Sequence, residues 1–386
     1  MTNANAPKKS TNRGKKIPEK VSTRLWGKAA GRCQYRGCNM PLWIDSLTKK
    51  EFNSAYLAHI IASSPDGPRG NEKLSHELAT DISNIMLLCD AHHRLIDKED
   101  EDGHPIELLR EMKEEHEERI ALVTDIDVSN QTNVVLFGTN IGNHDASINF
   151  KEISPAILKE KKYPVSRNPI ILNLNNSVFS DEKQSFWEIE KSNLQAQFER
   201  KIKFSPPDIT PHFSLFGFAP QPLLIELGKL FSDIKDVDVF HKQREPKPTW
   251  IWSDDQIETK YIIKEPEEIK EKIALIVSLS ASIAEDRILK VLGENTSIWT
   301  FTIDAPSNDF LKSKNQLSDF RKVFRELLNQ IKYRHGEENE INIFPVAPVA
   351  INVEIGRVWM PKADLPLKVY DQNRKTNGFQ YALTIQ

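Results

Sequence analysis

The sequence predicts two domains, an α+β domain in the N-terminal part and an α/β domain after it, and three observations carry this prediction. The chain of 386 residues is longer than one ordinary domain. All three cysteines fall within residues 33–89, which points to one small metal-stabilised unit. From about residue 211 onward, strand-like and helix-like segments alternate, which is typical of an α/β layer with a largely parallel sheet.

The expected boundaries follow changes in composition along the chain. Residues 1–20 are basic and polar, so we expect a flexible arm whose lysines could touch phosphates. Residues 21–124 are expected to form the first domain and residues 171–386 the second. Residues 125–170, in which Asn, Thr and Gly are frequent, are expected to be a linker with a short strand of its own at 134–137.

The overall composition excludes several classes of protein. With 39% apolar and 28% charged residues, the chain has the composition of a soluble globular protein. A formal net charge of -3 gives no global attraction to nucleic acid, so any such surface must be local. No apolar run reaches the length of a membrane span, and the first residues lack the apolar core of a secretory signal. Reduced cysteines are typical of the cytoplasm, where we therefore expect the protein.

The three cysteines and one histidine form two half-sites for a metal ion. Cys33 and Cys38 bracket a tight turn at Arg36-Gly37. Cys89 is followed by His92, with two residues between them, at the start of an expected helix. Two closely spaced pairs of sulfur and nitrogen ligands suit tetrahedral Zn²⁺, and a site with no open position is structural. The alternative is three ordinary buried thiols, which would lie beside partners of this kind only by chance.

His59, Asn84 and His93 lie in the same stretch but outside that metal site. Together with the cysteines they resemble the HNH nuclease family, of the zinc-bearing ββα-metal kind. The order of the residues matches that family, and so does the gap from Asn84 to Cys89. In the family, two cysteines usually complete the metal site before the final histidine. In this chain His92 takes the place of the second of them, and His93 matches the final histidine.

The resemblance implies a role for each of these residues. His59 is expected to be the general base that activates water against a phosphodiester. Asn84 is expected to orient His59 by a hydrogen bond to its ring or backbone, and His93 to hold a catalytic Mg²⁺ or similar ion. Many family members carry an acidic residue before the first histidine, where this chain has Ala58, and Asp81 is a candidate to replace it. On its own, His59 would be read as a half-buried structural imidazole.

Two further segments complete the expected first domain. Residues 63–78 contain several Pro and Gly residues and are expected to form a loop bordering a DNA groove, with Arg69 and Lys73 facing phosphate. Residues 107–123 have apolar residues at helical spacing with charged residues between them, so an amphipathic helix is expected to support the domain.

The second domain is expected to contain two Rossmann-like halves, because a strand–loop–helix pattern starts at Phe213 and again at Ala274. The expected strands are 211–218, 237–240, 249–252, 272–279, 297–303, 340–345 and 351–360, and the expected helices are 180–200, 222–231, 283–292 and 317–333. The letters show no repeat of fixed period. A Gly-rich dinucleotide fingerprint and a phosphate loop ending in Gly-Lys-Ser/Thr are both missing from the sequence.

A ligand site is expected in this domain because ligands of open α/β sheets bind beyond the carboxyl ends of the strands. That rule selects Gly217, Phe218 and Pro220 on the first half, and Ser278, Ser280 and Pro345 on the second. Aromatic side chains could stack on a base, and the candidates are Trp250, Trp252 and Tyr370. The alternative for these three rings is a place in the core.

The second half of the chain also resembles a known family. The segments that carry this likeness are 212–220, 250–252, 274–280 and 344–348, which are similar to parts of a SAVED domain. SAVED domains resemble two fused CARF-type Rossmann-like units that sense cyclic oligonucleotides. An HNH nuclease followed by SAVED resembles the effector of bacterial CBASS anti-phage systems.

The combined resemblance implies a regulated enzyme. A partner cyclase would make a cyclic di- or trinucleotide, and the SAVED half would bind it and assemble the chain into a homo-oligomer, by family likeness a tetramer. The HNH domains would then cut double-stranded DNA. One alternative is a restriction-type HNH enzyme that needs no ligand and reads DNA with its C-terminal half. Another is a zinc-binding scaffold without catalytic activity, in which His59 and His93 are structural.

Overall fold

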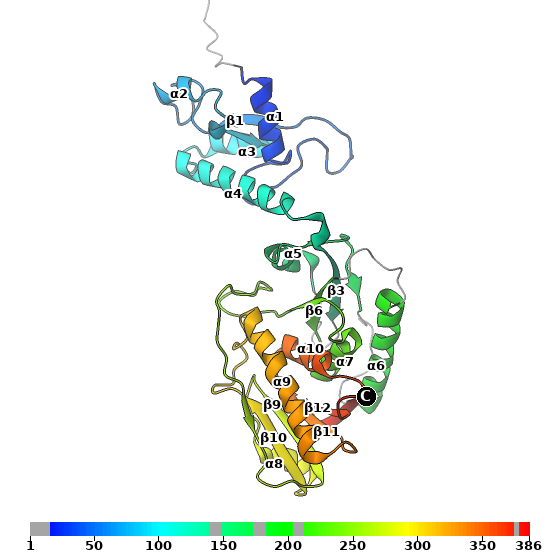
Figure 1. Cartoon of the computed structure of the whole chain (residues 1–386). Coiled ribbons are helices and arrows are strands. Elements are labelled where there is room, and N and C mark those ends of the chain that lie inside the picture. The colour runs from blue at the N-terminus through cyan, green and yellow to red at the C-terminus, as the bar shows by residue number, and fades with distance from the viewer. Residues whose placement is uncertain (1–15, 139–147, 173–182, 204–211, 374–377) are drawn as a thin grey trace, which may run out of the picture. The chain divides into compact units, whose positions relative to one another are not determined.

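The computed structural model describes residues 16–138, 148–172, 183–203, 212–373 and 378–386 (Figure 1). The chain divides into two compact units, Met1–Asp127 and Val128–Gln386. Most of the expected N-terminal arm, residues 1–15, lies outside the described residues. None of the helices in the described ranges combines the length and the apolar character that crossing a bilayer requires.

The first unit is built around one short antiparallel strand pair. Its elements are α1 (Glu19–Lys28), β1 (Tyr56–His59), α2 (Leu74–Glu77), η1 (Ile82–Asn84), β2 (Ile85–Leu88), α3 (Asp90–Arg94), η2 (Leu95–Glu99) and α4 (Ile106–Thr124). The continuous apolar run of β2 is buried along its whole length and pairs with β1, so that His59 lies opposite Ile85. The core beneath it includes Leu25, Leu42 and Leu109. The expected amphipathic helix at 107–123 corresponds to α4.

The second unit contains two sheets with parallel strands, as the alternating pattern predicts. A five-stranded sheet holds β3 (Gln131–Gly138), β4 (Tyr163–Pro164), β5 (Ile170–Ile171), β6 (Phe213–Phe218) and β7 (Val237–Phe240), in the order β4-β3-β6-β7 with β5 also on β3. All of its pairings are parallel.

The six-stranded sheet has the order β13-β12-β11-β9-β10-β8. Its members are β8 (Ile262–Lys264), β9 (Lys272–Ser278), β10 (Thr296–Thr302), β11 (Ile341–Val346), β12 (Leu367–Asn373) and β13 (Gly378–Ile385). The four inner strands pair in parallel, and the two edge strands, β8 and β13, are antiparallel to their neighbours.

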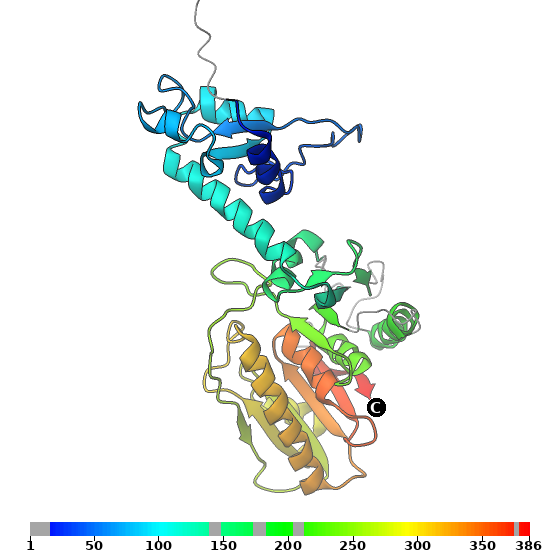
Figure 2. The ribbon, with the colours of Figure 1, turned by 45° about the horizontal axis from the view of Figure 1, so that its top comes forward.

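The helices of the second unit cover these sheets. They are α5 (Phe150–Lys159), α6 (Gln184–Phe198), α7 (Gln221–Phe231), α8 (Glu285–Leu292), α9 (Lys314–His335) and α10 (Val349–Val358), with the short segments η3 (Val128–Asn130) and η4 (Glu199–Lys203). Strand β9 is apolar at almost every position because both of its faces are buried. Leu275 and Val277 belong to the cluster that includes α9, which lies over this sheet in Figure 2. Ala274 and Ile276 pack with Ile288 of α8.

Three expectations for this half of the chain differ from the structure. Residues 351–360, expected as a strand, lie largely in α10, where an apolar run buried on all sides carries no period that separates helix from strand. Residues 249–252 form an isolated bridge from Thr249 to Gln243 followed by irregular chain. The expected linker 125–170 contributes β3, α5 and β4, because the apolar run at 134–137 is buried in the middle of a sheet.

Helices α7 and α10 meet along a seam that has room for backbone only. A methyl group added at Gly228 would overlap the carbonyl oxygen of Val353, and one added at Gly356 would overlap that of Ile225. Each glycine is the tenth residue of a stretch that opens with Ala-Pro and carries Glu two positions before the glycine, 219–229 in the first half and 347–357 in the second. The sequence therefore contains one local repeat, which occurs only twice and so has no fixed period.

The seam makes a testable prediction for stability. Gly228→Ala is expected to lower the unfolding temperature of the second unit by several degrees, because a methyl against a fixed carbonyl costs about 1–3 kcal/mol or more. The measurement is calorimetry of the full chain. Gly27→Ala, in α1, is the control, since a methyl group there would have no neighbour within 4 Å. An unchanged transition in Gly228→Ala would contradict the close packing.

Candidate metal centre and active site

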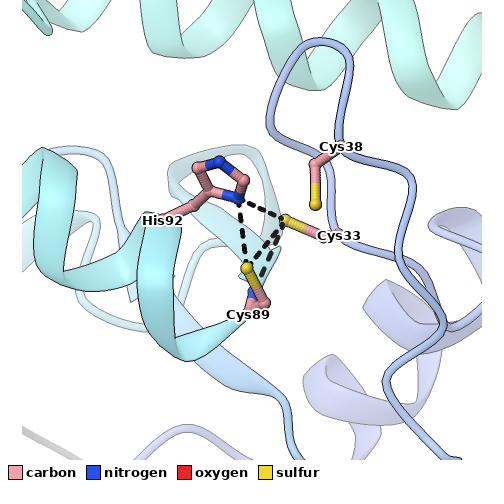
Figure 3. Close-up of side chains that lie close together, drawn as sticks. All are labelled: Cys33, Cys38, Cys89 and His92. Atoms are coloured by element: carbon pink, nitrogen blue, oxygen red, sulfur yellow. Dashed lines mark hydrogen bonds between the residues drawn. The ribbon is translucent and has the colours of Figure 1, made fainter. Parts of the chain in front are cut away.

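Cys33, Cys38, Cys89 and His92 come together as one cluster in the first unit (Figure 3). Their ligand atoms all lie within 4.8 Å of one another. The Sγ atoms of Cys33 and Cys89 are 3.8 Å apart. His92 Nδ1 lies 3.6 Å from Cys33 Sγ and 3.1 Å from Cys89 Sγ. These residues come from two segments. Cys33 and Cys38 lie at the two ends of a tight turn, the knuckle (residues 33–38). Cys89 directly precedes α3, which contains His92.

The cluster fits a tetrahedral zinc ion. With Zn–S near 2.3 Å and Zn–N near 2.0–2.1 Å, the edges of a tetrahedral site are about 3.8 Å for S···S and about 3.6 Å for S···N. The distances from Cys33 to Cys89 and to His92 match these edges, whereas the 3.1 Å between Cys89 Sγ and His92 Nδ1 is shorter than such an edge. Burial raises the pKa of the Cys33 thiol, so a thiolate there needs a cation beside it. Burial also lowers the pKa of His92, which keeps a neutral ring available as a ligand. The Cys₃His cluster therefore suggests structural zinc.

Tyr35 fixes the orientation of the His92 ring. The two rings are stacked, with centroids 4.0 Å apart and planes 7° apart. The Tyr35 hydroxyl is in turn hydrogen-bonded to His104 Nε2 at 3.0 Å, and His104 Nδ1 contacts the carbonyl oxygen of Asp100. Such outer contacts set the direction in which a ligating imidazole points. Tyr35 lies between Cys33 and Cys38, but ligand spacing alone does not distinguish it from its neighbours.

His59 is the last residue of β1, and its ring has a defined tautomer. Nε2 lies 2.9 Å from the carbonyl oxygen of Ala79. A carbonyl only accepts hydrogen bonds, so Nε2 carries the proton and Nδ1 keeps its lone pair. The half-buried ring therefore presents a nitrogen that can accept a proton.

Asn84 is 1% exposed and holds the chain directly after His59. Its Oδ1 accepts a hydrogen bond from the Ile61 N–H at 2.9 Å, and its Nδ2 donates to the Ile61 carbonyl at 2.9 Å. Nδ2 also lies 3.3 Å from the carbonyl oxygen of Leu78. In place of the expected hydrogen bond to the ring or backbone of His59, Asn84 thus makes two hydrogen bonds to the backbone of Ile61, two residues further along the chain. A flat amide can satisfy both backbone groups of Ile61 at once, which explains this choice.

His93 lies against the other end of β1. Its ring stacks on Tyr56, with centroids 4.6 Å apart and planes 13° apart. His93 Nε2 is 3.3 Å from Asp97 Oδ2. Burial opposes ionisation of Asp97, but hydrogen bonds from His93 and Arg69 hold the pKa of its carboxyl below the ordinary value. The structure thus brings His59 and Asn84 together at one end of β1 and places His93 at its start.

Two charged residues have different partners from those expected. The Arg69 side chain is 6% exposed and binds Asp97, so it points inward rather than toward phosphate. The Asp81 carboxylate accepts hydrogen bonds from the backbone and hydroxyl of Ser83 at 2.8 Å and caps η1. Asp81 therefore has a local structural role and does not replace the acid missing at Ala58.

In the second unit, six of the expected ligand residues lie at or near the carboxyl ends of parallel strands. They are Gly217 and Phe218 in β6, Pro220 before α7, Ser278 and Ser280 at the end of β9, and Pro345 in β11. A side chain at Gly217 would press against Leu224 of α7, so this glycine serves packing. Ser278 Oγ donates to the carbonyl oxygen of Ala281 at 2.6 Å and holds the turn after β9.

Gln221, which was not among the expected ligand residues, joins the two halves of the second unit at this edge. Its Oε1 accepts hydrogen bonds from the Ala347 N–H and from Asn352 Nδ2, each at 3.0 Å. The N-terminus of α7 and that of α10 are therefore neighbours. The repeated Ala-Pro pairs at 219–220 and 347–348, which precede both helices, are the sequence signal that could have revealed this arrangement.

The three aromatic candidates are part of the core. Trp250, Trp252 and Tyr370 are 2%, 3% and 9% exposed. Trp250 packs edge-on against Phe216, and Tyr370 stacks on Phe344 while its hydroxyl donates to Asn342 Oδ1. These rings offer no open face to a base in this structure and occupy the place in the core that was given as the alternative. Large aromatic side chains bury much apolar surface, which favours the core.

Comparison with known proteins identifies part of this unit. Residues 194–385 match the family model described as "SMODS-associated and fused to various effectors sensor domain", SAVED. A comparison with curated proteins finds no match.

Similar solved structures include the Acinetobacter baumannii Cap4 SAVED/CARF-domain containing receptor with the cyclic trinucleotide 2'3'3'-cAAA. It has 10% identity and a TM-score of 0.42 over 81% of this chain and 65% of that one. The same receptor with 3'3'3'-cAAA has 7% identity and a TM-score of 0.40 over 72% and 60%. The Moraxella osloensis Cap4 SAVED/CARF-domain containing receptor has 8% identity and a TM-score of 0.35 over 73% and 60%. The match therefore spans less than two thirds of these receptors.

Proposed function

We propose that this chain, whose residues 194–385 are a SAVED sensor domain, is a metal-dependent HNH-type endonuclease that a cyclic oligonucleotide activates to cut double-stranded DNA. In this proposal it acts as a CBASS anti-phage effector. The observation that carries the nuclease assignment is the strand pair β1–β2 followed by α3. One end of this unit supports the Cys₃His cluster, and its strands and helix carry His59, Asn84 and His93.

The residues of the first unit suit phosphodiester hydrolysis. His59 is held through Nε2, so Nδ1 is the atom that would take a proton from the attacking water. Asn84 fixes the chain after His59 through its two bonds to Ile61 and so limits where the base can move. His93 would hold a divalent ion, which when bound neutralises charge on the scissile phosphate.

The SAVED domain, residues 194–385, has features that suit a ligand with more than one phosphate. The N-termini of α7 and α10 lie side by side, tied by Gln221, at the carboxyl ends of β6 and β11. Helix N-termini attract anions through their backbone N–H groups and the helix dipole. A paired arrangement with repeated local sequence suits a cyclic di- or trinucleotide. Binding drives assembly, by family likeness into a tetramer, only if the assembled state binds this ligand more tightly.

A plasmid-cleavage assay tests the proposal. The full chain with Mg²⁺ is expected to leave a plasmid intact alone and to cut it when one member of a panel of cyclic di- and trinucleotides is added. Size measurements with the same ligand are expected to show a homo-oligomer. Cutting without any ligand would favour the restriction-type enzyme. No cutting under any ligand or divalent metal would favour the zinc-binding scaffold.

A further inference from the structure

The missing acid before His59 leaves a chemical gap in the metal site. Side chains alternate along a strand, so Ala58 shares a face of β1 with Tyr56, whose ring stacks on His93. An acidic residue at position 58 would therefore lie on the same face of β1 as the ring that stacks on His93. Mg²⁺ prefers oxygen ligands and is usually held by one or two carboxylates together with substrate phosphates. An imidazole alone is a poor match for such an ion.

Asp97 is the carboxylate that fills this gap in space. Its Oδ2 lies 3.3 Å from His93 Nε2. A hydrogen bond from His93 joins the two atoms here, and a divalent ion bound to both would take the place of its proton. Around a metal ion with ligand distances near 2.0–2.1 Å, neighbouring ligand atoms are about 3 Å apart. The observed separation is close to this value, so one ion can contact both side chains after a small adjustment.

Arg69 fixes the position of that carboxylate. Its guanidinium binds Asp97 Oδ1 at 2.6 Å and the carbonyl oxygen of Ile60 at 2.8 Å. A third bond goes to the carbonyl oxygen of Ile96. One buried cation thus connects the residue after His59 with the carboxylate beside His93. Because Arg69 takes one oxygen of Asp97, the other is directed at the imidazole.

We propose that Asp97 is the carboxylate ligand of the divalent ion beside His93, and that Arg69 is the positioning residue that holds it. This inference rests on the proposed nuclease function and names the ligand that its metal site lacks at Ala58. It also gives the loop at 63–78 a structural role, which is to place Arg69 beside Asp97. The loop turns Arg69 inward instead of offering it to DNA.

The test is Mn²⁺ binding to the zinc-loaded full chain, followed by electron paramagnetic resonance without DNA or cyclic nucleotide. Asp97→Asn keeps the size and a hydrogen-bond acceptor but loses the charge, and it is expected to weaken Mn²⁺ binding by about 100-fold or more. Asp102→Asn, at an exposed aspartate on the following turn, is the matched control and is expected to bind as wild type does.

One further measurement and one further variant show whether Asp97 is itself a metal ligand or acts only through His93 or through folding. In protein labelled with ¹³C-aspartate, electron–nuclear double resonance is expected to detect a carboxylate carbon coupled to Mn²⁺, and Asp97→Asn is expected to abolish that coupling. Asp97→Asn combined with Arg69→Gln removes both buried charges, so it is expected to fold even if the single variant does not. This double variant is expected to lack the Mn²⁺ site as well.

Three results of the binding test would overturn the inference. They are wild-type protein that binds no Mn²⁺ at millimolar concentration, Asp97→Asn that binds within about threefold of wild type, and weaker binding without any ¹³C coupling in wild type. The proposed function is judged separately. A chain that never cuts DNA but loses its Mn²⁺ site in Asp97→Asn retains the ligand assignment. Cleavage by Asp97→Asn at the wild-type rate overturns only the ligand assignment.

Discussion

His59→Ala is expected to reduce ligand-activated DNA cleavage by about 10²–10⁴-fold, the range that general-base catalysis contributes. The ring contributes a proton acceptor at Nδ1, because Nε2 is used on the carbonyl oxygen of Ala79. Alanine removes the acceptor and leaves the strand pairing of β1 intact. The measurement is the initial rate of plasmid cutting at saturating cyclic nucleotide and Mg²⁺.

Two controls accompany this variant. His76→Ala, at an exposed histidine of α2 in the same unit, is expected to cut at the wild-type rate. Zinc content and unfolding temperature of His59→Ala are expected to match those of wild type, because the ring lies outside the Cys₃His cluster. If His59→Ala keeps more than half of the wild-type rate, His59 is not the base.

Removing the metal from the Cys₃His cluster is expected to unfold the first unit while the second stays folded. Structural zinc in small domains contributes about 10–16 kcal/mol of apparent binding free energy, which exceeds the stability of a typical domain. The first unit has a small core, and two of the four ligands come from a knuckle with little regular structure. The measurement is calorimetry and hydrogen exchange with and without a strong zinc chelator, together with the zinc content per chain.

Variants at Cys38 refine this test, since Cys38 is the half-buried sulfur of the cluster. Cys38→Ala removes a ligand and is expected to reproduce the chelated state. Cys38→His supplies a nitrogen ligand and is expected to retain zinc and most of the stability. A first unit that melts at the same temperature with and without metal would rule out a structural role for zinc.

The metal cluster could be predicted from the sequence because its chemistry is local and depends on residue type. Cys33 and Cys38 form one turn, and Cys89 and His92 form another, so only two half-sites had to meet. The strand alternation of the second half was also readable, since buried parallel strands such as β9 appear as apolar runs.

The contacts made by Arg69 could not be predicted in this way. The residue lies in a loop rich in Pro and Gly, and its partner Asp97 is 28 residues away. A charged residue in such a loop is usually exposed, and only the folded chain shows that three backbone and side-chain acceptors turn it inward. The burial of the aromatic candidates could not be predicted for the opposite reason. Trp250 and Trp252 occupy irregular chain, yet they are buried against the sheet.

The backbone-only seam between α7 and α10 limits how a signal can travel through the sensor half. The two helices lie on different sheets but touch through Gly228 and Gly356. Neither helix can rotate away at this contact without exposing main-chain atoms. Opening a hinge between the two sheets of the second unit is therefore disfavoured. A ligand bound beside one sheet is therefore expected to move both helices together.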